Sequence, residues 1–130
     1  MKKILFALGV LSASFAQAQT VDVTTLSLHN QQVHRVAFCR IIATMGIDES
    51  KNKNLKRGKV FDIYMLLDSN GFMKREQNSS STFYDATDDT KTKLVLEEIE
   101  VTQEMINKCE IDLKDILREK YIPNFAYMEK

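Results

Sequence analysis

Two cysteines constrain the fold of this chain more than any other feature of its sequence. Cys39 and Cys109 each lie in a long segment whose apolar residues recur at helical spacing. If both segments are helices, both cysteines face the apolar side, and a bond between them joins two core-forming helices. Closing a loop of about 70 residues stabilises a domain by roughly 4 kcal/mol in the chain-entropy model. That is comparable to the whole net stability of a small domain.

The segment around the first cysteine predicts a helix over about residues 25–46. Gly46 follows the last apolar position, where a glycine often ends a helix in a left-handed turn. The periodic residues of this segment are Val33, Val36, Ala37 and Ile41, joined by Phe38, Ile42 and Met45.

The segment around the second cysteine predicts a helix over about residues 103–121. Thr102 is placed as its N-cap, and Pro123 lies just beyond its end, where a helix is expected to stop. Its apolar face consists of Ile106, Cys109, Leu113 and Ile116, joined by Met105 and Leu117.

Residues 1–18 have the three parts of a cleavable secretory signal. Lys2 and Lys3 precede an apolar run of eight residues, and Ala16-Gln17-Ala18 gives the small-x-small pattern before a cleavage site. The run is too short to span a bilayer. We therefore expect export and a single mature domain over residues 19–130, periplasmic in a bacterium and extracellular otherwise. In such an oxidising compartment a Cys39–Cys109 disulfide is favoured over two buried thiols.

The middle of the chain has less regular patterns. Residues 51–59 predict a basic loop, and the apolar run 60–67 fits either a buried strand or a helix. Ser69-Asn70-Gly71 predicts a turn from which Phe72 and Met73 could start a returning strand. The Ser- and Asp-rich residues 78–89 predict a loop, and residues 93–101 fit a strand or a helix. The expected fold is mainly α, a small helical domain with its first and last long helices joined by the disulfide; a short β-hairpin is an option for the middle.

Residues for catalysis or metal binding are scarce. His29 and His34 are five apart, which places their rings on different faces of a helix rather than at metal-ligand spacing. Ser79-Ser80-Ser81 has no nucleophile frame around it, and with Asn78 it forms a glycosylation sequon that matters only in a eukaryote. Bonded cysteines cannot act as nucleophiles. Four glycines leave no phosphate-binding loop. We expect a protein that is not an enzyme and has no metal or cofactor.

Charge is separated along the chain. Residues 51–59 carry five basic groups and no acid, whereas residues 85–119 carry eleven acids and five bases. Without Lys2 and Lys3 the chain has 16 basic and 18 acidic residues, a net charge of −2, which gives no reason to expect a nucleic-acid partner. Patches of opposite sign can steer a charged partner. The candidate partner-binding residues are Lys51, Lys53, Lys56, Arg57, Lys59, Glu97, Glu98 and Glu100.

Two functions follow as expectations. The first is an exported binding protein that inhibits or neutralises a macromolecular partner, most simply another protein. The alternative is a carrier of a small hydrophobic ligand, or a periplasmic chaperone, with an apolar cavity between its helices. Residues of adaptable shape would line that cavity: Phe38, Met45, Met65, Phe72 and Met105.

In layout the chain resembles periplasmic immunity proteins, which neutralise wall-attacking effectors, and acid-protective periplasmic chaperones. Both are small exported helical proteins with one disulfide. Residues 39–49 (CRIIATMGIDE) are also similar to the cysteine-helix segment of insect odorant-binding proteins. That family has a further cysteine four residues before the match, where this chain has Arg35. These likenesses concern the general plan, so no family residue is carried over.

Overall fold

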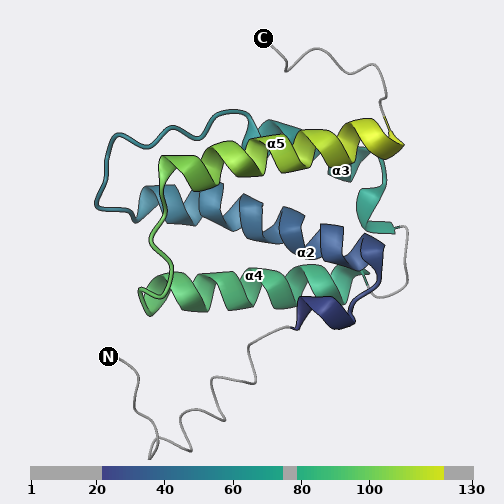
Figure 1. The fold of residues 1–130 in the computed structure, drawn as a ribbon, viewed down its shortest axis with the longest axis horizontal. Helices are drawn as coiled ribbons and strands as arrows, with labels where there is room; N and C mark the ends of the chain where they lie inside the picture. The colour runs from purple at the N-terminus through teal and green to yellow at the C-terminus, as the bar shows by residue number, and fades with distance from the viewer. Residues whose placement is uncertain (1–21, 75–78, 122–130) are drawn as a thin grey trace, which may run out of the picture.

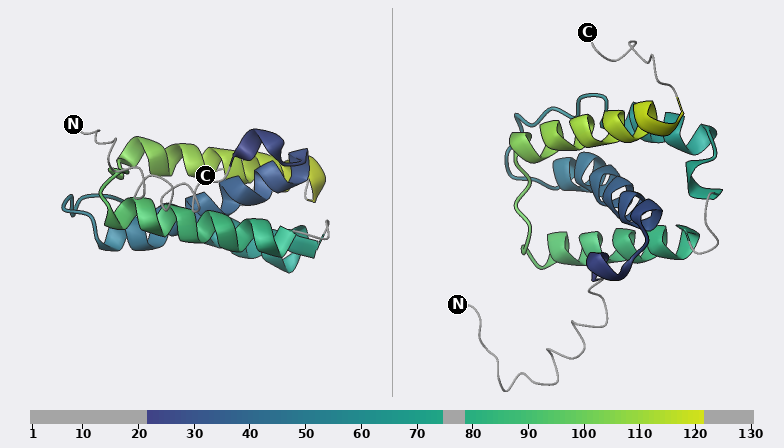
Figure 2. Two further views of the ribbon diagram at one scale, coloured as in Figure 1. Left: turned by 90° about the horizontal axis from the view of Figure 1, so that it is seen from below. Right: turned by 45° about the vertical axis from the view of Figure 1, so that its right-hand side comes forward.

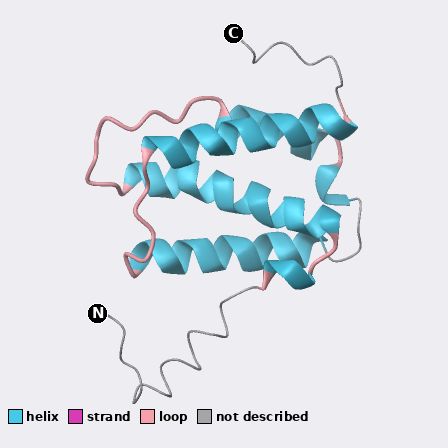
Figure 3. Cartoon of the chain, in the orientation of Figure 1, coloured by secondary structure: helices cyan, strands magenta, loops and turns pink. Residues whose placement is uncertain are grey.

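A computed structural model describes residues 22–74 and 79–121, which form a mainly helical domain (Figure 1). Its α-helices are α2 (Leu28–Ile41), α3 (Val60–Ser69), α4 (Ser79–Val95) and α5 (Gln103–Lys120). A π-helical turn, η2 (Ile42–Gly46), prolongs α2, and the 3-10 turns are η1 (Val23–Thr25) and η3 (Phe72–Lys74). The two described ranges contain no strand (Figure 3). The predicted signal, residues 1–18, lies outside the described residues, as do Asn78 and Pro123.

Helix α2 lies at the centre of the arrangement (Figures 1 and 2). Helix α4 packs along one side of it, and α5 lies on the other side with α3 packed against α5. Helices α2 and α4 run in one direction, and α3 and α5 run in the opposite direction (Figure 1). Buried apolar residues from all four helices form one core, whose fully buried members include Val33, Val36, Ile42, Ile63, Leu67, Ile106, Leu113 and Leu117.

The predicted disulfide is present in this core. Cys39 of α2 is bonded to Cys109 of α5, their Cα atoms are 5.5 Å apart, and both side chains are 0% exposed. Each cysteine therefore lies on the buried face of its helix, as the apolar spacing predicts. The bond fixes α2 to α5 in a loop of sequence separation 70.

Side-chain caps begin two of the helices. The Ser27 hydroxyl accepts a hydrogen bond from the backbone N–H of Asn30, so α2 begins a few residues later than predicted. The predicted cap of α5 is confirmed, because the Thr102 hydroxyl accepts the N–H of Met105 at 3.2 Å. Both caps satisfy backbone donors that have no partner inside the helix.

The prediction that Gly46 ends the helix in a left-handed turn is wrong. The positive φ angles among the described glycines belong to Gly58 and Gly71, and the helical backbone runs on through Gly46 to Asp48. Gly46 is buried, and a Cβ atom added there would lie 2.8 Å from Cγ2 of Val101. This glycine is therefore required by the close approach of Val101, which lies just before α5.

The apolar run 60–67 is a helix, and the hairpin that was an option after it is not confirmed, because residues 22–74 and 79–121 contain no strand. Val60, Ile63 and Leu67 are buried at helical spacing in α3. The expected turn is present, with Gly71 at φ +81°, but the chain then enters the 3-10 turn η3 instead of a strand. Phe72 explains this outcome, because its ring is buried against the rings of His29 and Tyr121 in the core, and the described part of the chain offers no second strand to pair with it.

The prediction of a loop over residues 78–89 is also wrong, because residues 79–95 form α4. Apart from Phe83, the buried residues of α4 are small or polar, so this helix lacks the apolar stripe that identifies a helix in a sequence. Ser79 is fully buried, and its hydroxyl donates to Oδ1 of Asn30 on α2 at 3.0 Å. Thr90 donates to the carbonyl of Ala86 within α4.

Candidate functional site

The basic loop, residues 51–59, connects the end of α2 and η2 to α3 and is attached to α5. The side-chain amide of Gln103 accepts the backbone N–H of Lys56 at 2.8 Å and donates to the carbonyl of Lys56 at 2.9 Å. The N–H of Lys59 donates to Oε1 of Glu110 at 3.1 Å. These bonds use the loop's backbone, so they fix its position without engaging the side chains of Lys51, Lys53 and Lys56.

The side chains of the basic loop differ in their partners. Arg57 is turned back to the domain, where it pairs with Asp48 at 3.0 Å and donates to the carbonyl of Ala43. The side chains of Lys51, Lys53 and Lys56 are exposed, and none of them has an ion pair with a described residue. Lys59 is partly buried. The loop therefore presents three lysines to solvent.

The acidic turn, residues 96–102, connects α4 to α5 and contains all three predicted glutamates. Helix α4 ends in a Schellman motif: the N–H of Glu98 bonds to the carbonyl of Lys93, and the N–H of Glu97 bonds to that of Leu94. Glu97 takes the left-handed position of this motif, with φ +60°, where glycine is usual. Glu97, Glu98 and Glu100 are exposed.

Two exposed apolar residues precede these glutamates, and sequence reasoning missed them. Val95 is 67% exposed and Leu96 is 58% exposed at the end of α4. Both lie in the segment 93–101, whose sequence fits either a strand or a helix. Correct assignment of α4 would have identified the pair as surface, because helical spacing places them off the face that packs on α2.

The structure brings the basic loop and the acidic turn together. Both lie at the same end of the helical domain (Figures 1 and 3). Gln103 connects them directly, because it is the first residue of α5 after the acidic turn and holds the backbone of Lys56. Three of the other acids in residues 85–119, Asp89, Glu110 and Asp112, each pair with a basic residue. We call this end of the domain, comprising residues 51–59 and 95–102, the charged end.

Glu97 gives a stability prediction, because a non-glycine residue in the left-handed region costs about 1–2 kcal/mol. The substitution Glu97→Gly should raise the free energy of unfolding by about 0.5–1 kcal/mol after the entropy cost of glycine. Urea denaturation measures the difference. Glu98→Gly is the matched control and should lower stability slightly, because Glu98 does not have a positive φ. Equal changes in the free energy of unfolding for the two substitutions would show that the backbone of Glu97 is not strained.

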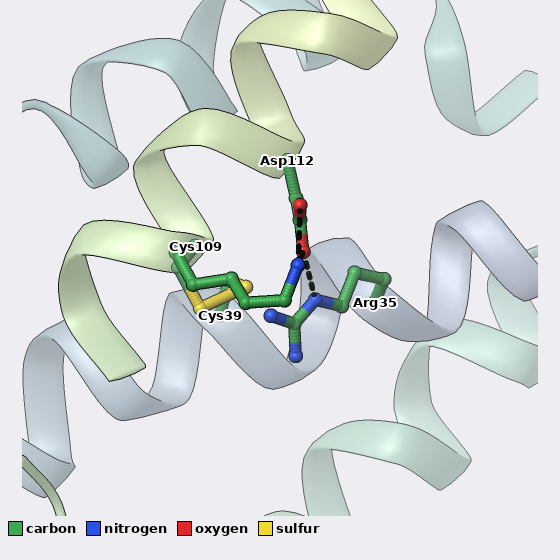
Figure 4. A network of polar contacts seen from close by, with 5 residues as sticks. Arg35, Cys39, Cys109 and Asp112 are labelled. Atoms are coloured by element: carbon green, nitrogen blue, oxygen red, sulfur yellow. Dashed lines mark hydrogen bonds and ion pairs between the residues drawn. A yellow bond between two sulfur atoms is a disulfide. The ribbon is translucent and has the colours of Figure 1, made fainter. Parts of the chain in front are cut away.

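A groove between α2 and α5 is the second surface feature. It has a volume of about 400 Å³, is open to solvent, and is lined by Leu28, Gln31, Gln32, Arg35, Asp112, Asp115, Ile116 and Glu119. Arg35 and Asp112 cross it in an ion pair of 2.8 Å beside the disulfide, and Lys108 contacts the same carboxylate at 3.2 Å (Figure 4). Six of its eight lining residues are therefore charged or polar.

The five residues proposed to line an apolar cavity do not line this groove. Phe72 is fully buried in the core, whereas Phe38 and Met105 pack against the core from its edge. Met45 is partly buried, and Met65 is 49% exposed on α3. The structure thus distributes these side chains between core and surface.

His34 is the second of the two histidines that lie five residues apart on α2. It is half-buried on α2, and its Nε2 atom is buried without a hydrogen-bond partner among the described residues. Burial is the main cause that lowers the pKa of His34 below 6.5; the Asp89 carboxylate acts in the opposite direction, and Lys93 and Arg35 lower the pKa further.

The lowered pKa of His34 predicts a pH-dependent stability. As pH falls, the unfolded chain binds a proton at His34 before the folded protein does. The folding stability that comes from keeping His34 neutral is therefore complete above about pH 6.5, and it is lost as pH falls from there towards the folded-state pKa. Unfolding free energies of wild-type protein and His34→Gln should be compared at pH 7.5 and 5.5. The wild type should lose more stability than the variant on acidification, and equal losses would refute the prediction.

Comparisons with protein-family models, with curated proteins and with solved structures found no match to this chain. Function must therefore be argued from geometry. No helix in residues 22–74 and 79–121 is long and apolar enough to cross a membrane. In the same part of the chain, no group of three or more histidine, cysteine or acidic side chains is placed to hold a metal ion.

Proposed function

We propose that this chain is an exported binding protein that inhibits or neutralises a protein partner through its charged end. The observation that carries the proposal is the meeting of two oppositely charged loops, some 40 residues apart in sequence, through the contact of Gln103 with Lys56. Oppositely charged patches side by side favour a partner with the complementary arrangement and reject partners of uniform charge.

Two further features of the charged end support a protein partner. Val95 and Leu96 supply exposed apolar area beside the glutamates, and interfaces combine an apolar centre with a charged rim. Glu97 keeps a strained backbone conformation that glycine would relieve. Such strain is often retained where a side chain has a role other than stability. A nucleic acid would be repelled by the three glutamates next to the lysines.

The carrier alternative has weaker support. Its proposed lining residues are divided between the core and the surface, and six of the eight residues that line the groove between α2 and α5 are charged or polar. A site for a hydrophobic ligand is normally lined by apolar and aromatic side chains.

The test is capture of the partner from the exported fraction of the source organism with purified wild-type protein as bait, followed by affinity measurements. Two variants change the charged end: Lys51→Glu, Lys53→Glu and Lys56→Glu together, and Glu97→Gln, Glu98→Gln and Glu100→Gln together. The matched control neutralises three exposed acids elsewhere: Asp85→Asn, Asp88→Asn and Glu119→Gln.

The proposal predicts that each charged-end variant weakens affinity by about tenfold or more, because three exposed pairs contribute up to ~1 kcal/mol each. The control variant should bind like the wild type, and affinity should fall as salt is raised. An affinity that is independent of salt, or an equal loss in all three variants, would exclude the charged end as the interface.

A further inference from the structure

Arg40 of α2 lies among aromatic side chains from two other helices. Its guanidinium carbon is 5.2 Å from the ring centre of Tyr64 on α3 and 6.0 Å from that of Phe83 on α4. The two rings are stacked on each other, with centres 6.0 Å apart and planes inclined by 22°. The aromatic side chains of α3 and α4 thus meet at the guanidinium on α2.

The positive charge of Arg40 has no carboxylate partner among the described residues. Arg35 pairs with Asp112 and Arg57 pairs with Asp48, whereas no acidic group in residues 22–74 and 79–121 forms an ion pair with Arg40. Its Nε atom is buried and has no hydrogen-bond acceptor within the same residues. A buried donor without an acceptor costs about 1–3 kcal/mol. Aromatic faces attract the cation but do not accept its directed hydrogen bonds.

Neighbouring side chains around Arg40 are of the types found at the centres of protein interfaces. Tyr84 is 66% exposed and contacts Phe83 edge-on, and Met65 is 49% exposed next to Tyr64. Phe61 contacts Tyr64 with ring centres 5.8 Å apart. Arginine, tyrosine, phenylalanine and methionine are enriched at such centres. We call Arg40, Phe61, Tyr64, Met65, Phe83 and Tyr84 the arginine–aromatic cluster.

The Tyr64 phenol does not supply a negative charge for Arg40. Burial is the main cause that raises the pKa of the Tyr64 phenol, so this group stays protonated and does not neutralise the guanidinium. Buried polar groups are normally paired, so the unpaired donor of Arg40 needs an explanation.

We propose that the arginine–aromatic cluster is a binding site for an acidic side chain of a partner protein, with the carboxylate on Arg40 and a neighbouring apolar side chain against the rings. A carboxylate matches the planar donors of a guanidinium. A phosphate polyanion fits less well, because such ligands require several cations and Arg40 is the cluster's single charge. The cluster belongs to α2, α3 and α4 and does not depend on the charged end.

The test is a nuclear magnetic resonance titration of the ¹⁵N-labelled protein with two blocked tripeptides, acetyl-Leu-Glu-Leu-amide and acetyl-Leu-Gln-Leu-amide, and with inorganic phosphate. The Nε–H signal of Arg40 should shift saturably with the glutamate peptide and much less with the glutamine peptide. Arg35 is an internal control, since it lies 5.2 Å from the Phe38 ring but already has Asp112 as its partner. Its signal should not move.

Substitutions in the arginine–aromatic cluster test the proposal without relying on the Nε–H signal of Arg40. Arg40→Lys keeps the charge but loses the planar donors, so it should lower the affinity for the glutamate peptide about tenfold. Arg35→Lys should change that affinity less than about twofold. If Arg40→Lys does not fold, Tyr84→Ala at the exposed rim should still weaken binding by about threefold. The proposal is overturned by equal binding of the two peptides, by phosphate binding more tightly than the glutamate peptide, or by no saturable shift of Arg40.

Discussion

Replacing both cysteines by alanine should lower the free energy of unfolding by about 2–5 kcal/mol, the usual loss for a native disulfide in a small secreted domain. Cys39 and Cys109 close a loop of sequence separation 70, and both are fully buried between α2 and α5. Opening the loop returns conformational freedom to the unfolded chain, and replacing the buried sulfurs removes core contacts. The melting temperature should fall by roughly 10 °C or more, since each kcal/mol corresponds to about 4–8 °C at this size.

Reduction of the wild-type protein provides the control for the cysteine prediction. The reduced wild type should unfold close to the double variant, because both lack the loop constraint. Titration of denatured, unreduced protein should find no free thiol. An unchanged melting temperature on reduction, or two titratable thiols, would show that the cysteines are unbonded and that α2 and α5 are held by packing alone.

Phe72→Ala should lower the free energy of unfolding by about 3–5 kcal/mol, as expected for a buried phenylalanine reduced to a methyl group. Phe72 is 1% exposed, and its ring contacts His29 at the start of α2 and Tyr121 at the end of α5. Through this one side chain, the turn η3 packs against both α2 and α5. Equilibrium urea denaturation measures the loss.

The matched control for this prediction is Met65→Ala, a large-to-small change at a residue that is 49% exposed. It should change stability by less than about 1 kcal/mol, since surface substitutions usually have small effects. A loss at Phe72 as small as that at Met65 would place Phe72 outside the core. Phe72 would then again be a candidate for lining a ligand cavity.

The sequence was sufficient to predict α2 and α5, the two helices that carry the disulfide. It was not sufficient to predict α4. Around Cys39 and Cys109 the residues facing the core are large and apolar, so their period is visible. Helix α4 instead packs with Ser79, Thr82, Ala86 and Thr90, which read as a loop although they allow close approach to α2. The Ser79–Asn30 hydrogen bond depends on a contact 49 residues apart, which no local pattern records.

The charged residues of the candidate site could be identified from the sequence, but their arrangement could not. Basic and acidic runs are local features, whereas the contact between Lys56 and Gln103 is a property of the fold. The positive φ of Glu97 was hidden because the sequence has glutamate where glycine is typical. The arginine–aromatic cluster was missed because Tyr64 was in a segment of undecided structure and Phe83 was in a predicted loop.

Export is the claim on which both the disulfide and the proposed partner depend, and intact-mass measurement of the native protein tests it most directly. The protein should be recovered from the periplasm or the culture medium. Its mass should correspond to a chain that begins at Gln19 and is two hydrogens lighter than the fully reduced form. Protein that retains Met1, is recovered from the cytosol and carries two free thiols would contradict the account.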